Sequence, residues 1–355
     1  MRPSWVQIDL NAIRENVGTL GRLIAPAQLC AVVKADGYGH GDVPVAEAAR
    51  EAGASWLAVA LVEEGVRLRE AGIEGPILLL SEAGEADVAE LVHWDLTATA
   101  YRNGFLTTLA AAGGRRVHIK VDTGMHRVGV PTADLVALVE HARQIGLEVE
   151  GVWTHFAVAE EVGDFTKEQV GRFDAAVAGL EIPMTHLANT AGGVLYPSAR
   201  RQLVRSGIGV YGLHPGPTTR SQVSLQPAMS ILSRVSLTQR LDAGERPSYG
   251  RRRALARTST VATVPIGYAD GVPRGLSAQG EVLIRGNRYP LAGTVTMDQI
   301  VVDVGDDPIE VGDEVVLIGH QGNEEITADE WATKLGTITY EIVSRIGPRL
   351  PRRYS

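Results

Sequence analysis

Lysine is scarce in this sequence, and two of the lysines lie in apolar runs where an amine could do chemistry. Lysine and arginine together number 34 in 355 residues, and only four of these are lysines: Lys34, Lys120, Lys167 and Lys334. Lys34 closes the run QLCAVVK, and Lys120 lies in VHIKVD. A lysine desolvated at the end of a buried strand has a lowered pKa and can form a Schiff base with an aldehyde, which arginine cannot do. The other interpretation is a lysine that lays its stem on apolar surface while its amine reaches water.

Glycines follow Lys34 at positions 37, 39 and 41, in the run KADGYGHGD. Such glycines let backbone N–H groups approach an anion at the start of a helix. The spacing differs from the dinucleotide fingerprint, because Asp42 stands where a third glycine would be needed, and there is no Walker-type GK[ST] pair. The run therefore indicates an anion site without identifying the anion.

The elements that must position these residues alternate between short apolar strands and amphipathic helices from about residue 28 to about residue 215. The strands are expected at 28–34, 56–60, 77–80, 96–100, 117–122, 148–156, 184–188 and 203–207. This rhythm is typical of βαβ units and predicts an α/β barrel of the (β/α)8, TIM-like type. Chemistry in that fold sits at the carboxyl ends of the strands.

After about residue 225 the predicted strands follow one another without intervening helices. They are expected at 230–241, 256–269, 280–286, 288–305 and 313–322, followed by a short helix near 328–335. We therefore expect a barrel over residues 1–222 and a mainly antiparallel β domain over 223–355, divided after the Pro/Gly-rich stretch 214–222. A first strand at 4–9 could belong to either domain.

The composition excludes several classes of protein. Apolar residues make up 45% of the chain, and the formal net charge of −8 comes without long blocks of like charge, so we expect a folded protein that does not bind nucleic acid. The longest stretch without charged residues, 182–199, contains two prolines, so we expect no membrane helix. The amino terminus has no apolar signal region, which predicts a cytoplasmic location. The single cysteine, Cys30, is expected to be a buried thiol.

The nine histidines do not form a metal-binding pattern. The HExxH motif is absent, as is any Cys/His cluster, so we expect no metal. His118 fits a surface or packing role, and His186 is expected to hold a strand end rather than to titrate.

Nine short motifs resemble, in order along the chain, those of the alanine racemase family of fold-type III enzymes. They are AVVKADGYGHG, IKVDTGMHRVG, THFA, HLANTAG, VRSGIGVYG, SYG, GYADG, MDQ and TITYEI. The resemblance covers the whole chain. It implies pyridoxal 5′-phosphate as cofactor, a barrel followed by a β domain, and a homodimer with shared active sites. It also implies interconversion of L-alanine and D-alanine, which supplies D-alanine for peptidoglycan.

The resemblance implies two catalytic bases, because inverting a carbon atom requires a proton to leave one face and another to arrive on the opposite face. Lys34 matches the residue that binds the cofactor and serves as one base. Tyr249 matches the second base, supplied by the β domain of the partner subunit. A phenol has an ordinary pKa near 10 and needs help at neutral pH. The resemblance assigns that help to His155, which meets Arg205, the residue that faces the pyridine nitrogen.

The resemblance also implies a set of binding residues. The cofactor contacts are Tyr38, Asn189, Thr190, the backbone at Gly207 and Ile208, and Tyr340. The substrate contacts are Arg127 and Met297, and the entrance residues are Tyr268, Arg274 and Asp298. Lys120 matches a lysine that is often carbamylated. The sequence departs from the family where Thr190 replaces a usual serine and where Thr294 replaces a usual arginine.

Three other functions stay open. In a barrel aldolase without a cofactor, Lys120 would form the Schiff base directly with a carbonyl substrate, but Tyr249 would then have no purpose. A carrier of pyridoxal phosphate would be a barrel without the β domain. A serine or broad-spectrum racemase would share the scaffold, since one methyl or hydroxyl group is worth only about 1–3 kcal/mol in discrimination.

Overall fold

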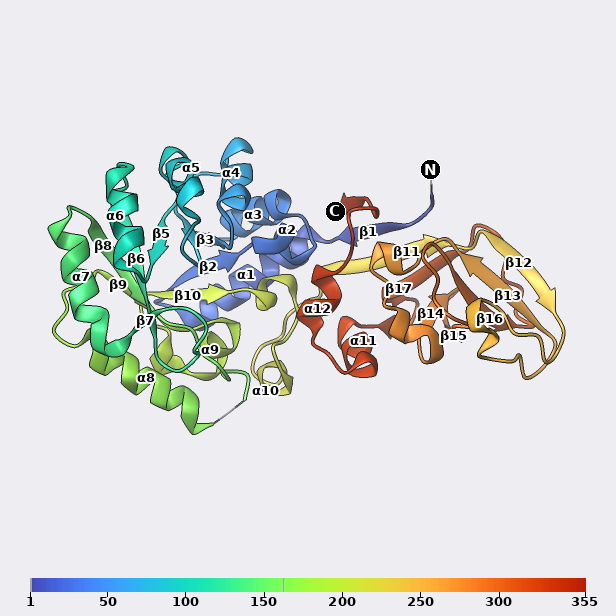
Figure 1. Ribbon diagram of the computed structural model, residues 1–355. Helices are drawn as coiled ribbons and strands as arrows, with labels where there is room; N and C mark the ends of the chain where they lie inside the picture. Colours follow the sequence, from blue (N-terminus) through green and yellow to red (C-terminus); the bar gives the residue numbers. More distant parts are fainter. Residues whose placement is uncertain (1, 162) are drawn as a thin grey trace. The chain divides into compact units, whose positions relative to one another are not determined.

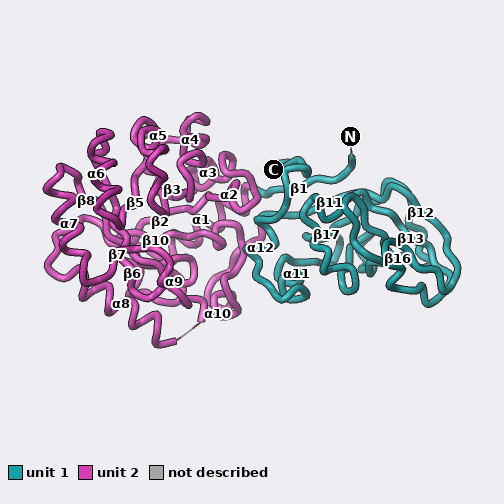
Figure 2. Tube along the Cα trace, in the orientation of Figure 1, with its two compact units in different colours: residues 1–9, 228–355 teal, residues 10–227 magenta. Residues whose placement is uncertain are grey.

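The computed structural model describes residues 2–161 and 163–355, which form two compact units. One unit is Leu10–Pro227, and the other combines the residues up to Asp9 with Ala228–Ser355. Figure 2 shows the two units in different colours.

The Leu10–Pro227 unit is a barrel of parallel strands. In the described part of the chain eight strands form its wall: β2 (Gln28–Val32), β3 (Trp56–Val59), β4 (Ile77–Leu79), β5 (Ala98–Ala100), β6 (Arg116–Asp122), β8 (Glu148–Trp153), β9 (Met184–His186) and β10 (Leu203–Ser206). They pair in the orders β10-β2-β3-β4 and β5-β6-β8-β9. A bridge between Leu78 and Thr97 joins the two groups, and the Arg205 amide donates to the Ala188 carbonyl and closes the ring. The predicted (β/α)8 barrel is confirmed.

Helices surround these strands (Figure 1). They are α1 (Leu10–Ile24), α3 (Asp42–Glu51), α4 (Val62–Glu70), α5 (Val88–His93), α6 (Asn103–Ala111), α7 (Leu135–Gln144), α8 (Asp164–Val177), α9 (Thr190–Leu195) and α10 (Pro217–Arg220). Their apolar residues repeat at helical spacing, as in α7, where Leu135, Leu138, Val139 and Ala142 are buried. A short strand, β7 (Val130–Pro131), pairs with β6 outside the wall.

The second unit is mainly antiparallel β structure. Its elements are β1 (Trp5–Ile8), β11 (Met229–Arg234), β12 (Leu237–Leu241), β13 (Ser259–Val264), β14 (Glu281–Ile284), β15 (Asn287–Pro290), β16 (Ile300–Gly305), β17 (Glu314–Gln321), β18 (Glu324–Ile326), α11 (Ala328–Leu335), α12 (Thr339–Ser344) and β19 (Arg352–Tyr354). One sheet has the order β15-β14-β17-β11-β1-β19, and another has the order β12-β13-β16. The first strand of the chain, β1, therefore pairs antiparallel with β11 and parallel with β19.

The continuous strand expected over 288–305 is interrupted. β15 ends at Pro290 and β16 begins at Ile300, with a loop between them. Within the loop, the Thr296 amide and hydroxyl both donate to the Gln299 carbonyl. This local turn competes with sheet pairing and is invisible to a pattern of alternating residue types.

The helix expected near 328–335 is present as α11. Thr327 caps its start by accepting a hydrogen bond from the Glu330 amide, and Gly336 ends it in a left-handed conformation. The sequence pattern did not predict α12, the helix that follows it. Among the described residues, none of the helices combines the length and apolar character needed to cross a bilayer.

Candidate active site

Lys34 lies just beyond β2, at the start of a strained turn. The strand ends at Val32, earlier than the expected 34, and the segment Lys34–Tyr38 (α2) is wound largely in the left-handed sense. Ala35, Asp36 and Tyr38 have φ values of 54°, 52° and 52°. That conformation costs L-residues roughly 1–2 kcal/mol each. Strain of this kind persists only where its surroundings enforce it, and it concentrates at functional sites.

The buried carboxylate of Glu64, at the start of α4, supports this turn. One oxygen accepts a hydrogen bond from the Ala35 amide at 2.7 Å, and the other accepts from the Ala60 and Leu61 amides at 2.8 and 3.1 Å. Glu64 thus ties the turn after β2 to the end of β3. Sequence analysis did not identify it, because an acidic residue in the first turn of a helix is an ordinary feature.

Several cations share the carboxyl end of the barrel. Lys120 lies within β6 rather than at its end, and its side chain is 4% exposed. Burial lowers the pKa of Lys120 to about 7, and the charges of Arg205, Arg127 and Lys34 add to that effect. Burial and the charge of Arg127 also lower the pKa of Lys34, against the opposing charge of Glu64. So much positive charge with little compensation suits an anionic ligand.

Arg205, on β10, is 2% exposed, and its guanidinium donates to groups of the neighbouring strands. One nitrogen donates to His186 Nδ1 at 2.8 Å, and the other donates to the Thr154 carbonyl at 2.8 Å and lies 3.3 Å from His155 Nδ1. Burial lowers the pKa of Arg205 to about 10, which leaves it charged at neutral pH. Burial and the charge of Arg205 hold the pKa of His155 well below its ordinary value, so this imidazole is neutral.

The indole of Trp153, at the end of β8, contacts two of these cations. The Lys120 amine lies 4.2 Å from the centre of the ring, and the Arg205 guanidinium lies 4.4 Å from it. The face of an indole ring attracts cations and thereby offsets part of the cost of burying them. Sequence analysis missed Trp153, although it directly precedes the THFA motif that contains His155.

A second group of the expected residues forms a cradle around the end of β10. The Thr190 hydroxyl accepts from the Gly207 amide at 3.1 Å and lies 3.0 Å from the Ser206 hydroxyl. A Cβ atom on Gly207 would lie 2.6 Å from the Tyr38 hydroxyl oxygen, so only glycine fits there. Asn189 caps α9 by accepting from the Gly192 amide at 2.9 Å, and Ile208 begins the 3-10 turn that follows Gly207.

The remaining expected residues lie in the other unit. Tyr249, Met297 and Tyr268 have exposed side chains, with Tyr249 exposed by 73%. Tyr268 and Arg274 line one hollow of about 270 Å³, whereas Asp298 forms an ion pair with Arg349 at 2.6 Å. Tyr340 lies on α12. The structure thus brings ten of the expected residues together on the barrel: Lys34, Tyr38, Lys120, Arg127, His155, Asn189, Thr190, Arg205, Gly207 and Ile208. Among the described residues, no cluster of three His, Cys, Asp or Glu side chains could hold a metal ion.

The loop that carries Tyr249 is strained and is held by Thr294. Ser248, directly before Tyr249, has φ 68° and ψ −177°, a conformation that costs about 1–3 kcal/mol. The buried Thr294 hydroxyl donates to the Tyr249 carbonyl at 2.7 Å, and the Ser248 hydroxyl donates to the Thr294 carbonyl at 2.6 Å. A Cβ atom on the neighbouring Gly293 would lie 2.4 Å from the Pro247 carbonyl oxygen. Thr294 therefore fixes the backbone of Tyr249 while the phenol stays exposed.

Replacing Thr294 with Val should loosen this loop, because it removes the hydroxyl donor and leaves the Tyr249 carbonyl without it. We expect a loss of about 1–3 kcal/mol in the free energy of unfolding, measured in urea. We also expect faster trypsin cleavage in the run Arg251–Arg253, followed by mass spectrometry. Thr294→Ser keeps the donor and should behave like the wild type. Equal cleavage rates for the Val variant and the wild type would contradict the prediction.

Replacing Lys120 with Met should stabilise the cofactor-free protein in carbon-dioxide-free buffer at low pH. The folded pKa of about 7 lies below the ordinary 10.5, so protonation opposes folding fully below pH 7, and the opposition fades as the pH rises toward 10.5. The gain in the free energy of unfolding should therefore be largest near pH 6 and vanish by about pH 10.5. Lys167→Met, at an exposed position on α8, is the control. A gain in the free energy of unfolding that does not depend on pH would show that the charge of Lys120 is not its cause.

The two units match known sequence families. Residues 8–215 match the profile of the alanine racemase N-terminal domain, and residues 228–354 match that of the C-terminal domain. An alanine racemase of Symbiobacterium thermophilum is 50% identical over 368 aligned residues, covering 100% of this chain and 97% of the relative.

Solved structures give the same result. The alanine racemase from a D-cycloserine-producing Streptomyces lavendulae aligns with a TM-score of 0.94 at 39% identity, covering 100% of this chain and 97% of that one. The alanine racemase of Bacillus anthracis, solved with bound L-Ala-P, aligns with a TM-score of 0.93 at 36% identity, covering 100% of this chain and 95% of that one. With both units matched in order and at full length, the chain belongs to the alanine racemase family of isomerases.

Proposed function

We propose that this chain interconverts L-alanine and D-alanine with pyridoxal 5′-phosphate held at Lys34. The observation that carries the proposal is the buried group of cations around Lys34, which stands on a turn of left-handed backbone. When bound, the cofactor supplies an electron sink that makes the α-proton of an amino acid acidic. The substrate assignment is supported by relatives that are named alanine racemases, one of them solved with bound L-Ala-P.

The residues of the barrel fit such a cofactor. A phosphate needs hydrogen-bond donors and close approach of backbone, which the Thr190 hydroxyl, the backbone at Gly207 and Ile208, and the Tyr38 phenol provide. Gly207 leaves room that a Cβ atom would fill. Tyr340 is a further phosphate donor in this proposal, and Asn189 supports the cradle by capping α9.

Arg205 controls the choice of reaction. Its buried guanidinium donates hydrogen bonds but does not readily release a proton, so beside a bound cofactor it would leave the pyridine nitrogen unprotonated and the ring a weaker electron sink. A weaker electron sink would favour return of the proton to carbon over transamination. His155, kept neutral beside Arg205, would accept from the guanidinium at Nδ1 and therefore offer its Nε2 proton as a hydrogen-bond donor to the oxygen of the second base.

The two bases come from different units of different chains. Lys34 serves one face of the substrate, and Tyr249 of the partner subunit serves the other, which requires a homodimer. The exposure of Tyr249 on its own unit agrees with a role in another chain. Arg127 and the backbone of Met297 bind the substrate carboxylate. Tyr268, Arg274 and Asp298 form the entrance, with Thr294 buried below the Tyr249 loop instead of supplying an arginine.

Carbamylation of Lys120 would relieve the excess of positive charge. It converts an amine that is costly to protonate into an anion beside Arg127 and Arg205. Bicarbonate should then stabilise the wild type and leave the Lys120→Met variant unchanged.

We further propose that the product D-alanine serves peptidoglycan synthesis in the cytoplasm. A serine or broad-spectrum racemase is the alternative substrate assignment, and relative turnover of alanine and serine distinguishes them.

Borohydride reduction of the protein with bound cofactor should attach the label to Lys34, because burial and the charge of Arg127 lower the pKa of its amine. Peptide mapping by mass spectrometry identifies the site. Lys34→Ala should lower racemisation in both directions by about 10²- to 10⁴-fold, whereas Lys167→Ala should have no effect. Label on Lys120 with Lys34 unmodified would instead support the aldolase alternative.

Mixed dimers test the shared site. Homodimers of Lys34→Ala and of Tyr249→Ala should each be impaired at both sites, since every site lacks one base. In a mixed dimer one site carries both substitutions and the other carries both wild-type residues. With free exchange, about half of the dimers are mixed, so roughly a quarter of all sites should recover. If a tag pull-down proves mixing and activity stays low, Tyr249 does not act across chains.

A further inference from the structure

A row of buried polar side chains leads from Arg205 through the barrel to its opposite end. Arg205 Nη1 lies 2.8 Å from His186 Nδ1, and His186 Nε2 lies 2.9 Å from His118 Nδ1. His118 Nε2 lies 3.4 Å from the Glu150 carboxylate. Arg205 and both histidines are nearly or fully inaccessible to solvent. The Glu150 side chain is 22% exposed, so the row ends at the surface.

The chemistry of these groups fixes where each proton lies. A guanidinium only donates, so His186 Nδ1 must accept and His186 must carry its proton on Nε2. His118 Nδ1 must then accept that proton's hydrogen bond, and His118 carries its own proton on Nε2. This proton points at Glu150, whose ionised carboxylate only accepts. Every donor meets an acceptor only when both histidines are neutral and Glu150 is charged.

The ionisation of the three groups agrees with that arrangement. Burial lowers the pKa of His118 and, together with the charge of Arg205, holds the pKa of His186 well below its ordinary value. The contact with His118 lowers the pKa of Glu150. Glu150 acts in the opposite direction and raises the pKa of His118, whereas the charges of Arg205 and Arg116 lower it, and the net shift is downward.

The surrounding residues pack closely against the imidazole rings of His118 and His186. A Cβ atom on Gly151 would lie 2.5 Å from His118 Nδ1, so the His118 ring can occupy its place only because residue 151 is glycine. The His186 ring stacks on Trp153 at 5.5 Å, and the His118 ring packs on Trp56 at 5.3 Å. His118 Nε2 and the Glu150 oxygen that faces it lie 3.4 Å apart, longer than an ordinary hydrogen bond, and neither atom has a hydrogen-bond partner among the described residues.

We propose that Glu150 is a positioning residue that acts on Arg205 through His118 and His186, by stabilising from the far end of the row the tautomers of both imidazoles that the Arg205 guanidinium requires. With a donor in place of the carboxylate, the His118 proton would move to Nδ1 and the His186 proton to its own Nδ1. The Arg205 guanidinium and the Nδ1–H of His186 would then both be donors, so the guanidinium would shift or lose its contact with His186. The expected loss of racemisation rests on the role proposed above for Arg205, whereas the expected tautomers of His118 and His186 do not depend on that role.

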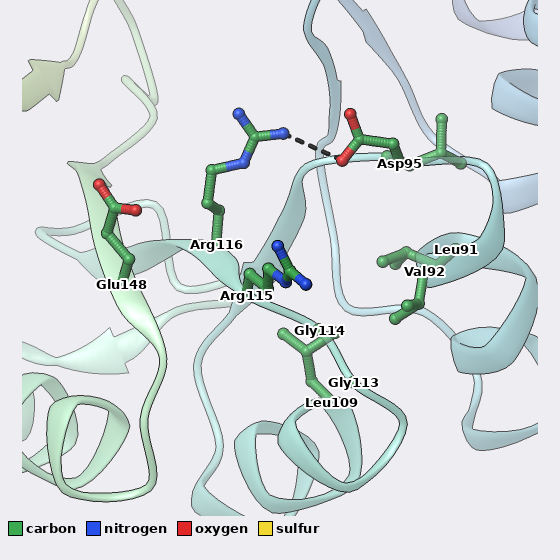
Figure 3. A pocket seen from close by; sticks show the side chains of 10 residues that line it. Leu91, Val92, Asp95, Leu109, Gly113, Gly114, Arg115, Arg116 and Glu148 are labelled. Atoms are coloured by element: carbon green, nitrogen blue, oxygen red, sulfur yellow. Dashed lines mark hydrogen bonds and ion pairs between the residues drawn. The ribbon is translucent and has the colours of Figure 1, made fainter.

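The test compares two substitutions at Glu150 with a matched control. Glu150→Gln keeps an acceptor oxygen, and Glu150→Lys offers only donors. Glu148 lies two positions earlier on β8, is exposed, and lines a neighbouring cavity of about 530 Å³ with Arg116 (Figure 3). Glu148→Lys therefore makes the same change of charge at the same end of the barrel without touching the row.

The first measurement is ¹⁵N NMR of histidine-labelled protein with bound cofactor, with the signals assigned by His118→Gln and His186→Gln. We expect both imidazoles to carry the proton on Nε2 in the wild type, in Glu150→Gln and in Glu148→Lys. In Glu150→Lys we expect the proton of His118 to move to Nδ1. The second measurement is racemisation. In Glu150→Lys we expect kcat to fall about tenfold and KM to stay within about twofold of the wild type, because a residue that orients a functional side chain without touching the substrate affects the rate more than binding.

The outcomes are distinct. An Nδ1 proton on either histidine in the wild type overturns the proposal, and so does an equal loss of kcat in Glu148→Lys. If Glu150→Lys fails to fold, Glu150→Ala takes its place, because Ala removes the acceptor without adding a donor. We then expect kcat of Glu150→Ala to fall below that of Glu150→Gln, and equal values would overturn the proposal. A wild type with the expected tautomers but no alanine racemisation would leave the tautomer arrangement standing and refute the proposed function.

Discussion

The concentration of positive charge at the carboxyl end of the barrel is the constraint on which the rest of the site depends. Lys34, Lys120 and Arg205 are all wholly or partly removed from water, and burial and neighbouring cations lower the pKa values of the two lysines. Charges in such surroundings are costly unless they are paired or bonded. Arg205 meets this cost with backbone carbonyls, two imidazoles and the face of Trp153. The amines of Lys34 and Lys120 remain available to bind an anion.

The same site depends on backbone that is held under strain. The left-handed turn at Lys34 is supported by Glu64, and the Tyr249 loop is supported by Thr294. In both places a buried side chain fixes the backbone next to a residue proposed to react, and the reacting side chain is left free to meet its ligand. Strain stored in this way keeps a group in place before the reaction begins, so less reorganisation is needed during it.

The division of labour between the two units follows from their folds. Parallel strands end at a common edge, which brings the barrel residues together from the ends of five strands, β2, β6, β8, β9 and β10. The antiparallel sheets of the other unit expose the loops between strands, and the residues expected to serve another chain lie on such loops. In the function proposed above, a reaction that needs groups on both faces of one carbon atom would draw one base from the barrel of one chain and an exposed base from the other chain.

The sequence by itself determined the barrel, the following β domain and most of the expected site residues. Hydrophobic periodicity is local, so it predicted the barrel strands to within a few residues, and the motifs around Lys34 and Arg205 carried the family resemblance. Only the tertiary structure decided what supports those residues. Glu64 lies 29 positions from the amide it holds, and His118 lies 68 positions from His186. The hydroxyl of Thr294 reaches a carbonyl 45 positions away. Such contacts depend on how strands and loops meet in space, and no pattern in the neighbouring residues records them.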